Sequence, residues 1–400
     1  MNPSDDQYRI STRVLWLAVI IGLMAILVAC GGSGVGVNIA GVGSGGTGAA
    51  ISGPISGFGS IIVNGVRIDD SSASITVDGR TGGTETDLKL GMMVDVEAVI
   101  DVSGVTGKAS RISGRSLLQG PVSDISAGAN RLTVLGMTVT VTPRTVFDGP
   151  GVTGLDALRA DDSVEVHGIP DTSGGLKATR IERLSANHEI HLTGKVQEGA
   201  GSSSFSVNGY TVQYQPGDLV SMPNGVTPGS VVSVKGTLSG TTVDASTVSA
   251  ISLAPAVKDR QRVEMEGVVT AFTSATRFEL NGMPVTVPGS ARVEGTVSLG
   301  DRVEVEGQVD GQTLVASKVE VDDDKTENDE EAFEMNGNIV GVNAAAATFT
   351  MRKGDVTVKW DSNTKFDKGS SSTLAPGAKV KVKGKMKGNI LLATKVERDD

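Results

Sequence analysis

Cysteine, histidine and aromatic residues are all scarce in this chain. A single cysteine, Cys30, excludes a disulfide within the chain and a zinc site built from several thiolates. Aromatic residues make up 3% of the sequence and the formal net charge is −10. Proteins that bind single-stranded nucleic acid stack bases on aromatic side chains in positively charged grooves. We therefore expect no nucleic-acid partner.

Motifs for catalysis and cofactor binding are also missing. No Gly-x-Ser-x-Gly nucleophile elbow occurs, and Gly107-Lys108 is followed by Ala109, without the Walker A spacing. The run from Gly41 to Gly46 matches a dinucleotide fingerprint only formally, because neither a strand before it nor a helix after it is predicted. We expect no enzyme activity and no cofactor.

The three histidines lie in stretches with the pattern of strands. His188 directly precedes a predicted strand at 189–192 and His191 lies within it, so the two would point to opposite faces. His167 takes an outward position in the strand that ends at Gly168, and we expect it to be solvated. No metal site is predicted.

The longest apolar run extends over sixteen uncharged residues, from Val14 to Ala29. A membrane-spanning helix needs about 20 such residues, whereas the apolar part of a signal peptide has about 7–15. The positive residues Arg9 and Arg13 precede the run, and the small Ala29 stands just before Cys30. The run therefore favours a signal peptide cleaved between Ala29 and Cys30; the alternative is an uncleaved anchor helix.

Leu27, Ala29 and Cys30 resemble the lipobox of bacterial lipoproteins. The resemblance implies a signal peptide at 1–29 and acyl chains such as palmitate on Cys30, and two chains suffice for stable anchoring. By the same resemblance, Gly31 implies sorting to the outer membrane if the host is Gram-negative. We expect a membrane-anchored lipoprotein of the cell envelope. Residues 30–52, the lipidated cysteine and a Gly-rich segment, are expected to form a flexible tether.

Five copies of one pattern fill the rest of the chain. Each copy opens with a glycine two residues before an aliphatic residue and reaches a short strand that ends in a turn. Three of these turns are Asn-Gly, the strongest short-range hairpin signal, because both turn residues need a positive φ. The copies, called repeats 1 to 5, span 53–116, 117–186, 187–254, 262–321 and 332–400. Their opening glycines are Gly53, Gly120, Gly194, Gly267 and Gly337, and the Asn-Gly turns begin at Asn64, Asn208 and Asn281.

The second half of each repeat holds a strand of period two, such as Val303-Glu-Val-Glu-Gly307, with valine on one face and charged residues on the other. Phe205, Phe278 and Phe349 fall at inward positions. A brief turn of helix is expected near 155–158. Short strands with Gly-rich turns predict an all-β protein made of five small closed barrels of the oligonucleotide/oligosaccharide-binding (OB) kind, with a small open sandwich as the alternative. Repeats this small are expected to pack partly on one another.

The same landmarks resemble a known family. The segment from Gly53 to Ile68, the five Gly-x-aliphatic openings, the Asn-Gly turns and the closing Ala-x-x-Val resemble tandem repeats of the domain-of-unknown-function 5666 family. The family has no established activity, so the resemblance implies a fold and an exported location but no catalytic residue. Repeat 5 departs most, with Arg-Lys-Gly in place of Asn-Gly.

Charge is unevenly distributed along the chain. Residues 322–331 hold seven acids and one lysine, which predicts an extended linker rather than a specific calcium site. Repeat 5 is basic, and its lysines alternate along one strand: Lys379, Lys381, Lys383, Lys385 and Lys387. They form either a solubilising outer face that guards an edge strand or a patch for an anionic partner.

Together these patterns predict a lipid-anchored envelope protein with a structural, spacer or interaction role. The alternative is a binding module for an anionic polymer, glycan or lipid headgroup through repeat 5. An envelope protein or an anionic glycan is the expected partner besides the membrane.

Overall fold

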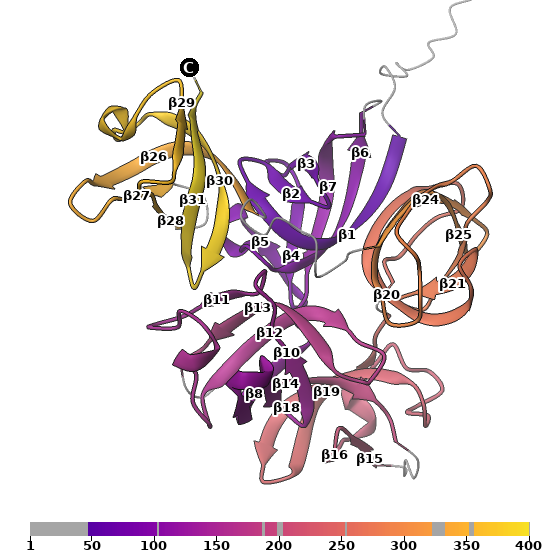
Figure 1. The fold of residues 1–400 in the computed structure, drawn as a ribbon. Helices are drawn as coiled ribbons and strands as arrows, with labels where there is room; N and C mark the ends of the chain where they lie inside the picture. The colour runs from indigo at the N-terminus through magenta and orange to yellow at the C-terminus, as the bar shows by residue number, and fades with distance from the viewer. Residues whose placement is uncertain are drawn as a thin grey trace, which may run out of the picture. The chain divides into compact units, whose positions relative to one another are not determined.

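The computed structural model describes residues 47–101, 104–185, 189–197, 203–252, 254–321, 333–351 and 356–399 (Figure 1). Within these ranges the chain forms strands, turns and short 3-10 helices, with no α-helix. None of their helices is both long enough and apolar enough to cross a membrane. The predicted signal peptide, Cys30, His188 and the acidic linker lie outside the described residues. The all-β prediction is confirmed.

Repeat 2 illustrates how one barrel is built. Its first strand, β8 (Leu118–Ser126), pairs with β9 (Arg131–Val134) on one side and with β12 (Ser163–Pro170) on the other. Strand β10 (Met137–Thr140) pairs antiparallel with β9 and parallel with β13 (Leu176–Arg183), which returns to β12. The ring of five strands is therefore closed, which removes unpaired edges.

Two smaller elements complete repeat 2. Strand β11 (Val146–Asp148) continues the parallel pairing along β13. The 3-10 helix η3 (Leu155–Ala157) lies where a brief turn of helix was expected.

The other repeats use the same strand order, and the curved orange strands of repeat 4 show the closed ring in Figure 1. In repeat 3 the first and second strands are joined beyond the end of the first by the Gln197 N–H, which donates to the Ser206 carbonyl at 2.9 Å. Repeat 1 consists of β1 (Thr47–Phe58), β2 (Ile61–Val63), β3 (Val66–Asp69), β4 (Ser74–Val77), β5 (Arg80–Gly83), β6 (Met93–Ile100) and β7 (Thr106–Gly114). Repeat 3 consists of β14 (Ile190–Lys195), β15 (Ser204–Val207), β16 (Tyr210–Gln213), β17 (Leu219–Val220), β18 (Val231–Ser239) and β19 (Thr242–Ala250).

Repeat 4 consists of β20 (Arg262–Ser274), β21 (Arg277–Leu280), β22 (Met283–Thr286), β23 (Arg292–Glu294), β24 (Arg302–Asp310) and β25 (Thr313–Val321). Repeat 5 consists of β26 (Phe333–Asn343), β27 (Thr348–Met351), β28 (Thr357–Lys359), β29 (Lys365–Asp367), β30 (Lys379–Lys387) and β31 (Ile390–Arg398). These are small five-stranded barrels of the OB-like kind, as predicted.

The predicted inward positions fill the barrel interiors. Phe205, Phe278 and Phe349 are all buried, each within the core of its own barrel. Burying one such side chain contributes about 1.5–3 kcal/mol. The period-two pattern therefore identifies the inner face correctly.

The Asn-Gly turns adopt the backbone that the sequence predicts. Asn64 and Gly65 have φ values of 49° and 76°, and Asn208 and Gly209 have values of 50° and 84°. Both residues of a type I′ hairpin turn need this left-handed region, which asparagine and glycine adopt at low cost. The turn at Asn281 has the same form; the corresponding turn of repeat 5 lies outside the described residues.

The opening glycine and the asparagine of the Asn-Gly turn are in direct contact with each other. The Asn64 amide folds back over Gly53 and donates a hydrogen bond to the Ser52 carbonyl at 3.1 Å. A Cβ on Gly53 would lie 2.1 Å from Asn64 Oδ1, and one on Gly194 would lie 2.6 Å from Asn208 Oδ1. No side chain fits at that distance, which explains why these repeats open with glycine.

The predicted tether extends too far into repeat 1. Strand β1 begins at Thr47, and Ala49, Ala50 and Ile51 are buried against the strands beside it. Residues 49 to 52 pair with β6 on one side and, in parallel, with β20 of repeat 4 on the other. Small and aliphatic residues suit this crowded strand, so the segment 47–52 belongs to the first barrel.

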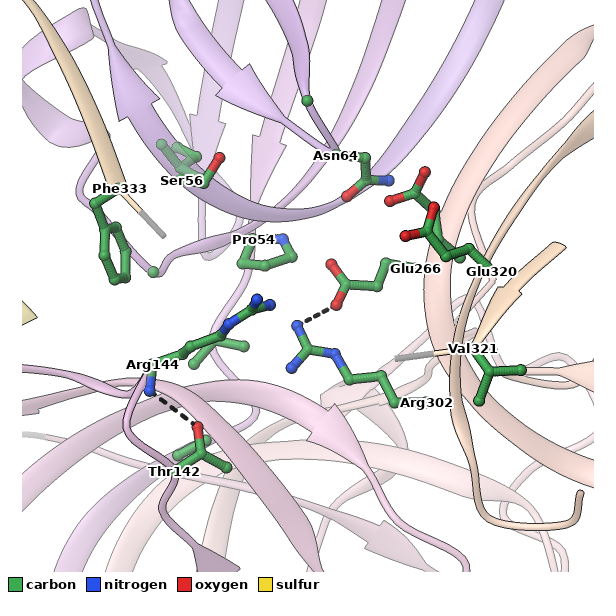
Figure 2. A pocket seen from close by; sticks show the side chains of 16 residues that line it. Pro54, Ser56, Asn64, Thr142, Arg144, Glu266, Arg302, Glu320, Val321 and Phe333 are labelled. Carbon is green, nitrogen blue, oxygen red and sulfur yellow. Dashed lines mark hydrogen bonds and ion pairs between the residues drawn. The ribbon is translucent and has the colours of Figure 1, made fainter. Parts of the chain in front are cut away.

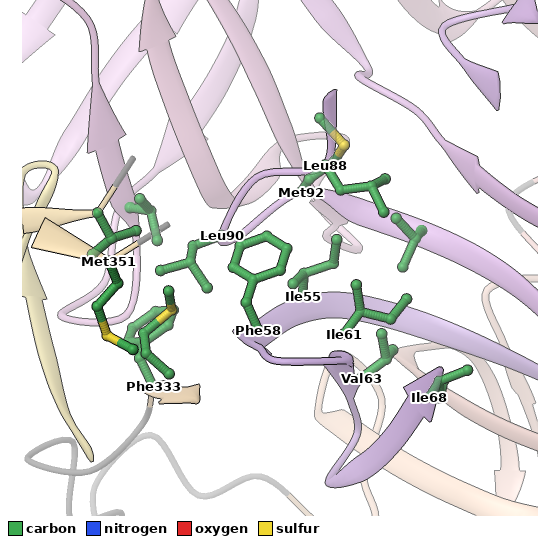
Figure 3. Packing of buried hydrophobic residues seen from close by; sticks show 14 of the residues in the cluster. Ile55, Phe58, Ile61, Val63, Ile68, Leu88, Leu90, Met92, Phe333 and Met351 are labelled. Atoms are coloured by element: carbon green, nitrogen blue, oxygen red, sulfur yellow. The ribbon is translucent and has the colours of Figure 1, made fainter. Parts of the chain in front are cut away.

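Neighbouring repeats share sheets and cores. Strand β1 pairs in parallel with β26 at Gly57 and Phe58, and β8 of repeat 2 pairs antiparallel with β14 of repeat 3. Figure 3 shows Phe58 and Leu90 of repeat 1 near Phe333 and Met351 of repeat 5, and all four lie in one buried cluster. The expected packing between repeats is confirmed, and it places outward strand faces against other barrels.

Candidate functional site

The lysines predicted to bind anions lie on one face of β30, because Val380, Val382 and Met386 between them point into the core. Lys379 pairs with Asp399 at 2.5 Å and Lys381 with Glu334 at 3.1 Å. Lys383 and Lys385 also interact with neighbouring groups. Lys387, at the end of the strand, is exposed.

Strand β30 is not an edge strand. It pairs with β26 over residues 379–384 and with β31 over residues 380–387, so the prediction that its lysines guard an edge is wrong. Alternating lysines on a valine-rich strand are typical of edge strands that are protected from pairing with other chains. Closure of the barrel, however, gives this strand two neighbours. Its outer face carries mixed charge, because Lys395 opposite Lys383 is itself paired with Asp367 at 2.8 Å.

His167 is fully buried, which corrects the expectation of a solvated side chain. Its Nδ1 lies 2.6 Å from the Arg115 carbonyl and its Nε2 3.1 Å from Glu165 Oε1. Burial alone would raise the pKa of Glu165, but the hydrogen bond and the charge of His167 hold it below the ordinary value. The position faces out of its own barrel, but neighbouring residues of the chain cover it.

Arg180 on β13 joins repeats 1 and 2. Its side chain is 2% exposed, and it donates to the Leu90 carbonyl of repeat 1 at 3.2 Å. It also pairs with Asp148 at 2.5 Å and with Glu182 at 2.7 Å. Two carboxylates and a carbonyl accept from the Nη1 and Nη2 groups, as a buried charge requires, while the buried Nε has no partner among the described residues.

His191 joins repeats 1 and 3. Its Nδ1 lies 3.2 Å from Ser116 Oγ, which donates to Asp78 at 3.0 Å, and its Nε2 lies 2.8 Å from Ser233 Oγ. Burial lowers the pKa of His191 to about 4, despite the opposing charge of Asp78. A ring that holds its proton so weakly is a poor general base, so this chain of hydrogen bonds is better suited to a polar joint than to catalysis.

Repeat 4 carries a face of carboxyl groups on β20, β24 and β25. Glu264 lies opposite Glu306, and Glu304 lies opposite both Glu266 and Glu320. Burial and then the neighbouring carboxylates raise the pKa of Glu264 and that of Glu304 to about 8. Glu266 is instead paired with Arg302, and both side chains are nearly buried, at 12% and 7% exposed.

A cavity of about 310 Å³ opens beside this carboxyl face. Its wall combines residues of repeats 1, 2, 4 and 5. In Figure 2 Arg144, on one side, and the Glu266–Arg302 pair, on the other, point toward the same space. The wall has polar and apolar parts: Pro54, Val321 and Phe333 contribute carbon surface, and Asn64, Thr142 and Glu320 contribute hydrogen-bonding groups.

Sequence reasoning missed this cavity and the buried carboxyl groups. The pattern Val-Glu-Val-Glu-Gly indicates which side chains leave the barrel, and Glu304 and Glu306 do so. It does not indicate that β24 faces another repeat. The one available signal was the pairing of like charges: glutamates at matching positions of β20 and β24 would repel each other if fully solvated and ionised.

The comparisons with known proteins bear on the repeats. The domain of unknown function DUF5666 matches residues 49–113, 119–182, 193–249, 266–320 and 336–397. No curated protein matches the chain. A solved structure described as Drosophila Unr CSD456 is 16% identical, with a TM-score of 0.17, over 51% of this chain and 98% of that one. A multidomain protein with nucleic acid binding domains from Streptococcus pneumoniae is 15% identical, with a TM-score of 0.14, over 53% of this chain and 75% of that one. Five matches spread along the described barrels settle the family: this chain belongs to the DUF5666 domain family.

Proposed function

We propose that the protein is a lipid-anchored component of the cell envelope in which five barrels serve as a scaffold for interaction. The observation that carries the proposal is the pairing of strands between repeats: β1 with β20 and β26, and β8 with β14. Repeats that share sheets hold a fixed arrangement of outer surfaces, which suits a spacer or a binding platform. The lipid on Cys30 is the proposed attachment.

The anchor is tested by mass spectrometry of the mature N-terminus and by cell fractionation. The wild-type chain should begin at Cys30 with acyl chains and should sediment with membranes. Cys30→Ala removes the acceptor thiol, so lipidation and cleavage at this bond should be lost. Ser33→Ala, a matched change in the same segment, should leave both intact. An intact Met1, or a mature end without lipid, would contradict the proposal.

The anion-binding role of repeat 5 is the second candidate. From 332 to 400 the sequence has twelve Lys and Arg against seven Asp and Glu, the opposite of the chain as a whole. Against it, Lys379 and Lys381 already have carboxylate partners. Any affinity for an anionic lipid vesicle or polysaccharide should therefore be modest and sensitive to salt.

Reversing the charge of Lys381, Lys383 and Lys385 to Glu tests this second candidate. Cosedimentation with anionic vesicles at low salt should be abolished by the triple reversal. Reversing Lys108, Lys177 and Lys195, which lie in other repeats, should change it little. Binding that survives the first reversal, or that is absent in the parent chain, would reject the patch.

A further inference from the structure

The cavity beside repeat 4 has the chemistry of a small-molecule site. Its volume, about 310 Å³, lies at the lower end of the usual range of ligand pockets, about 300–1,000 Å³. We propose that it binds a small polyhydroxylated amine, such as an amino sugar, with the Glu304 carboxyl group as the contact for the ammonium. This inference goes beyond the proposed scaffold role and depends neither on the lipid nor on the lysines of β30.

One carboxyl group of the wall supports an amine. Three carboxyl groups and the guanidinium groups of Arg144 and Arg302 line the cavity, and two of the carboxyl groups have cationic partners: Glu266 pairs with Arg302, and Glu320 pairs with Lys318 at 2.7 Å. Glu304 forms no hydrogen bond or ion pair with any described residue. A half-buried carboxyl group without a partner, at the wall of a cavity, suits a donor that enters from outside.

The protonation state of Glu304 is consistent with the binding of an ammonium group in place of its proton. Burial holds its pKa at about 8, together with the charges of Glu266, Glu320 and Glu306, against the opposing charge of Lys318. This carboxyl group is therefore protonated at neutral pH. An entering ammonium would replace the proton, so binding should release one.

The rest of the wall supports hydroxyl groups and a carbon ring. Thr179 is 7% exposed, and neither its Oγ1 nor Asn64 Oδ1 has a hydrogen-bond partner among the described residues. Thr142 Oγ1 accepts the Arg144 N–H at 3.2 Å and still has its own proton to donate. Phe333 adds an apolar surface against which the carbon face of a sugar ring can pack.

Isothermal titration calorimetry of the full chain in detergent tests the proposal with three probes. Glucosamine has the amine and the hydroxyls, N-acetylglucosamine lacks the charge, and ethylamine lacks the hydroxyls. We expect saturable binding of glucosamine, with the other two weaker by at least about tenfold, the effect of one charged hydrogen bond. Proton release, measured in buffers of different protonation enthalpy at a pH where the amine is charged, should accompany it.

Glu304→Gln provides the matched variant. It keeps the shape of the side chain and removes like-charge repulsion, so the barrel should fold, which circular dichroism checks. We expect glucosamine affinity to fall at least about tenfold and proton release to disappear. Glu279→Gln, on β21 of the same barrel and outside the cavity wall, should leave both unchanged.

Four outcomes would overturn the proposal. Absence of saturable glucosamine binding rejects the site, and equal affinity in Glu304→Gln rejects the assigned contact. N-acetylglucosamine that binds as tightly as glucosamine rejects the amine, and ethylamine that binds as tightly rejects the sugar.

Discussion

Repeats 4 and 5 carry a glutamate at the same place, three residues before the opening glycine. Glu264 on β20 lies opposite Glu306, whereas Glu334 on β26 lies opposite Lys383. Like charges directly opposite each other destabilise a sheet, and opposite charges stabilise it. The barrel fold therefore determines the position of the carboxyl group, and the cross-strand partner determines whether that group is repelled or forms an ion pair.

The surroundings increase the difference between the two glutamates. Glu264 is 4% exposed, and its carboxyl group has no hydrogen bond or ion pair with a described residue, so its pKa rises to about 8. Glu334 pairs with Arg67 of repeat 1 and, at 3.1 Å, with Lys381 of its own repeat. The first glutamate holds a proton at neutral pH; the second holds two repeats together.

The largest loss of stability should come from Arg302, the first residue of β24 in repeat 4. Lys379, the first residue of β30, holds the same position in repeat 5 and serves as the comparison. Arg302→Ala leaves the Glu266 carboxylate nearly buried without its partner, at a cost of about 3–5 kcal/mol in the free energy of unfolding. Lys379→Ala removes an exposed pair with Asp399 and should produce no measurable change. Urea unfolding followed by circular dichroism compares the two. Equal urea midpoints for the two variants would show that burial of the ion pair in repeat 4 does not make it more important for stability than the exposed pair in repeat 5.

The next effect is the pH dependence of repeat 4. Because the folded pKa values of Glu264 and Glu304 lie above the ordinary value of 4.5, the folded state binds more protons than the unfolded state between about 4.5 and 8. Stability from these groups is complete below 4.5 and is lost as the pH rises through 8. Glu264→Gln should therefore stabilise the chain at pH 9 by on the order of a few kcal/mol.

Thermal unfolding at pH 5 and pH 9 measures this effect. The wild type should lose more stability than Glu264→Gln between the two values. Glu294→Gln, in the same repeat and with a side chain that is 38% exposed, should follow the wild type. Parallel losses in all three chains would contradict the raised pKa.

How far sequence predicts this molecule depends on which face of a strand is considered. The inner face follows from local pattern: alternating valines, Asn-Gly turns and inward Phe278 and Phe349 all lie where expected. The outer face depends on which barrels meet. That is why His167, predicted to be solvated, is buried, and why Glu264, also outward in its own strand, is buried as well.

The candidate sites divide in the same way. The lysines of β30 do lie on one face, as alternation requires, but closure of the barrel removed the predicted edge. The cavity near Glu304 needs four repeats to form its wall, and no local pattern specifies that meeting. The membership of the family, by contrast, followed from the repeated landmarks themselves.

Repeat 3 has His191 at the position that Glu264 and Glu334 occupy in repeats 4 and 5, three residues before the opening glycine. Its folded pKa of about 4 lies below the ordinary 6.5, so the folded state binds fewer protons than the unfolded state between these values. Stability from this group is complete above 6.5 and is lost as the pH falls through 4, by up to about 3 kcal/mol. His191→Gln should remove that loss.

Unfolding between pH 7 and pH 4 tests the histidine. The wild type should weaken relative to His191→Gln as the pH falls, the reverse of the trend for Glu264. If His191→Gln loses as much stability between pH 7 and pH 4 as the wild type does, the buried His191 ring does not cause the loss.

The smallest effect should be that of Glu334→Gln, and its sign should be opposite to that of Glu264→Gln at pH 9. The substitution removes the charge that Arg67 and Lys381 share while keeping the side chain's shape, and the side chain is 17% exposed. Charged hydrogen bonds of this kind contribute about 1.5–3 kcal/mol when buried, so partial exposure should reduce the loss to about 1 kcal/mol. Hydrogen exchange should rise on both sides of the junction, in 57–58 and in 334–335, where β1 pairs with β26. Stabilisation by the same substitution in both repeats would mean that the cross-strand partner does not determine the role of this glutamate.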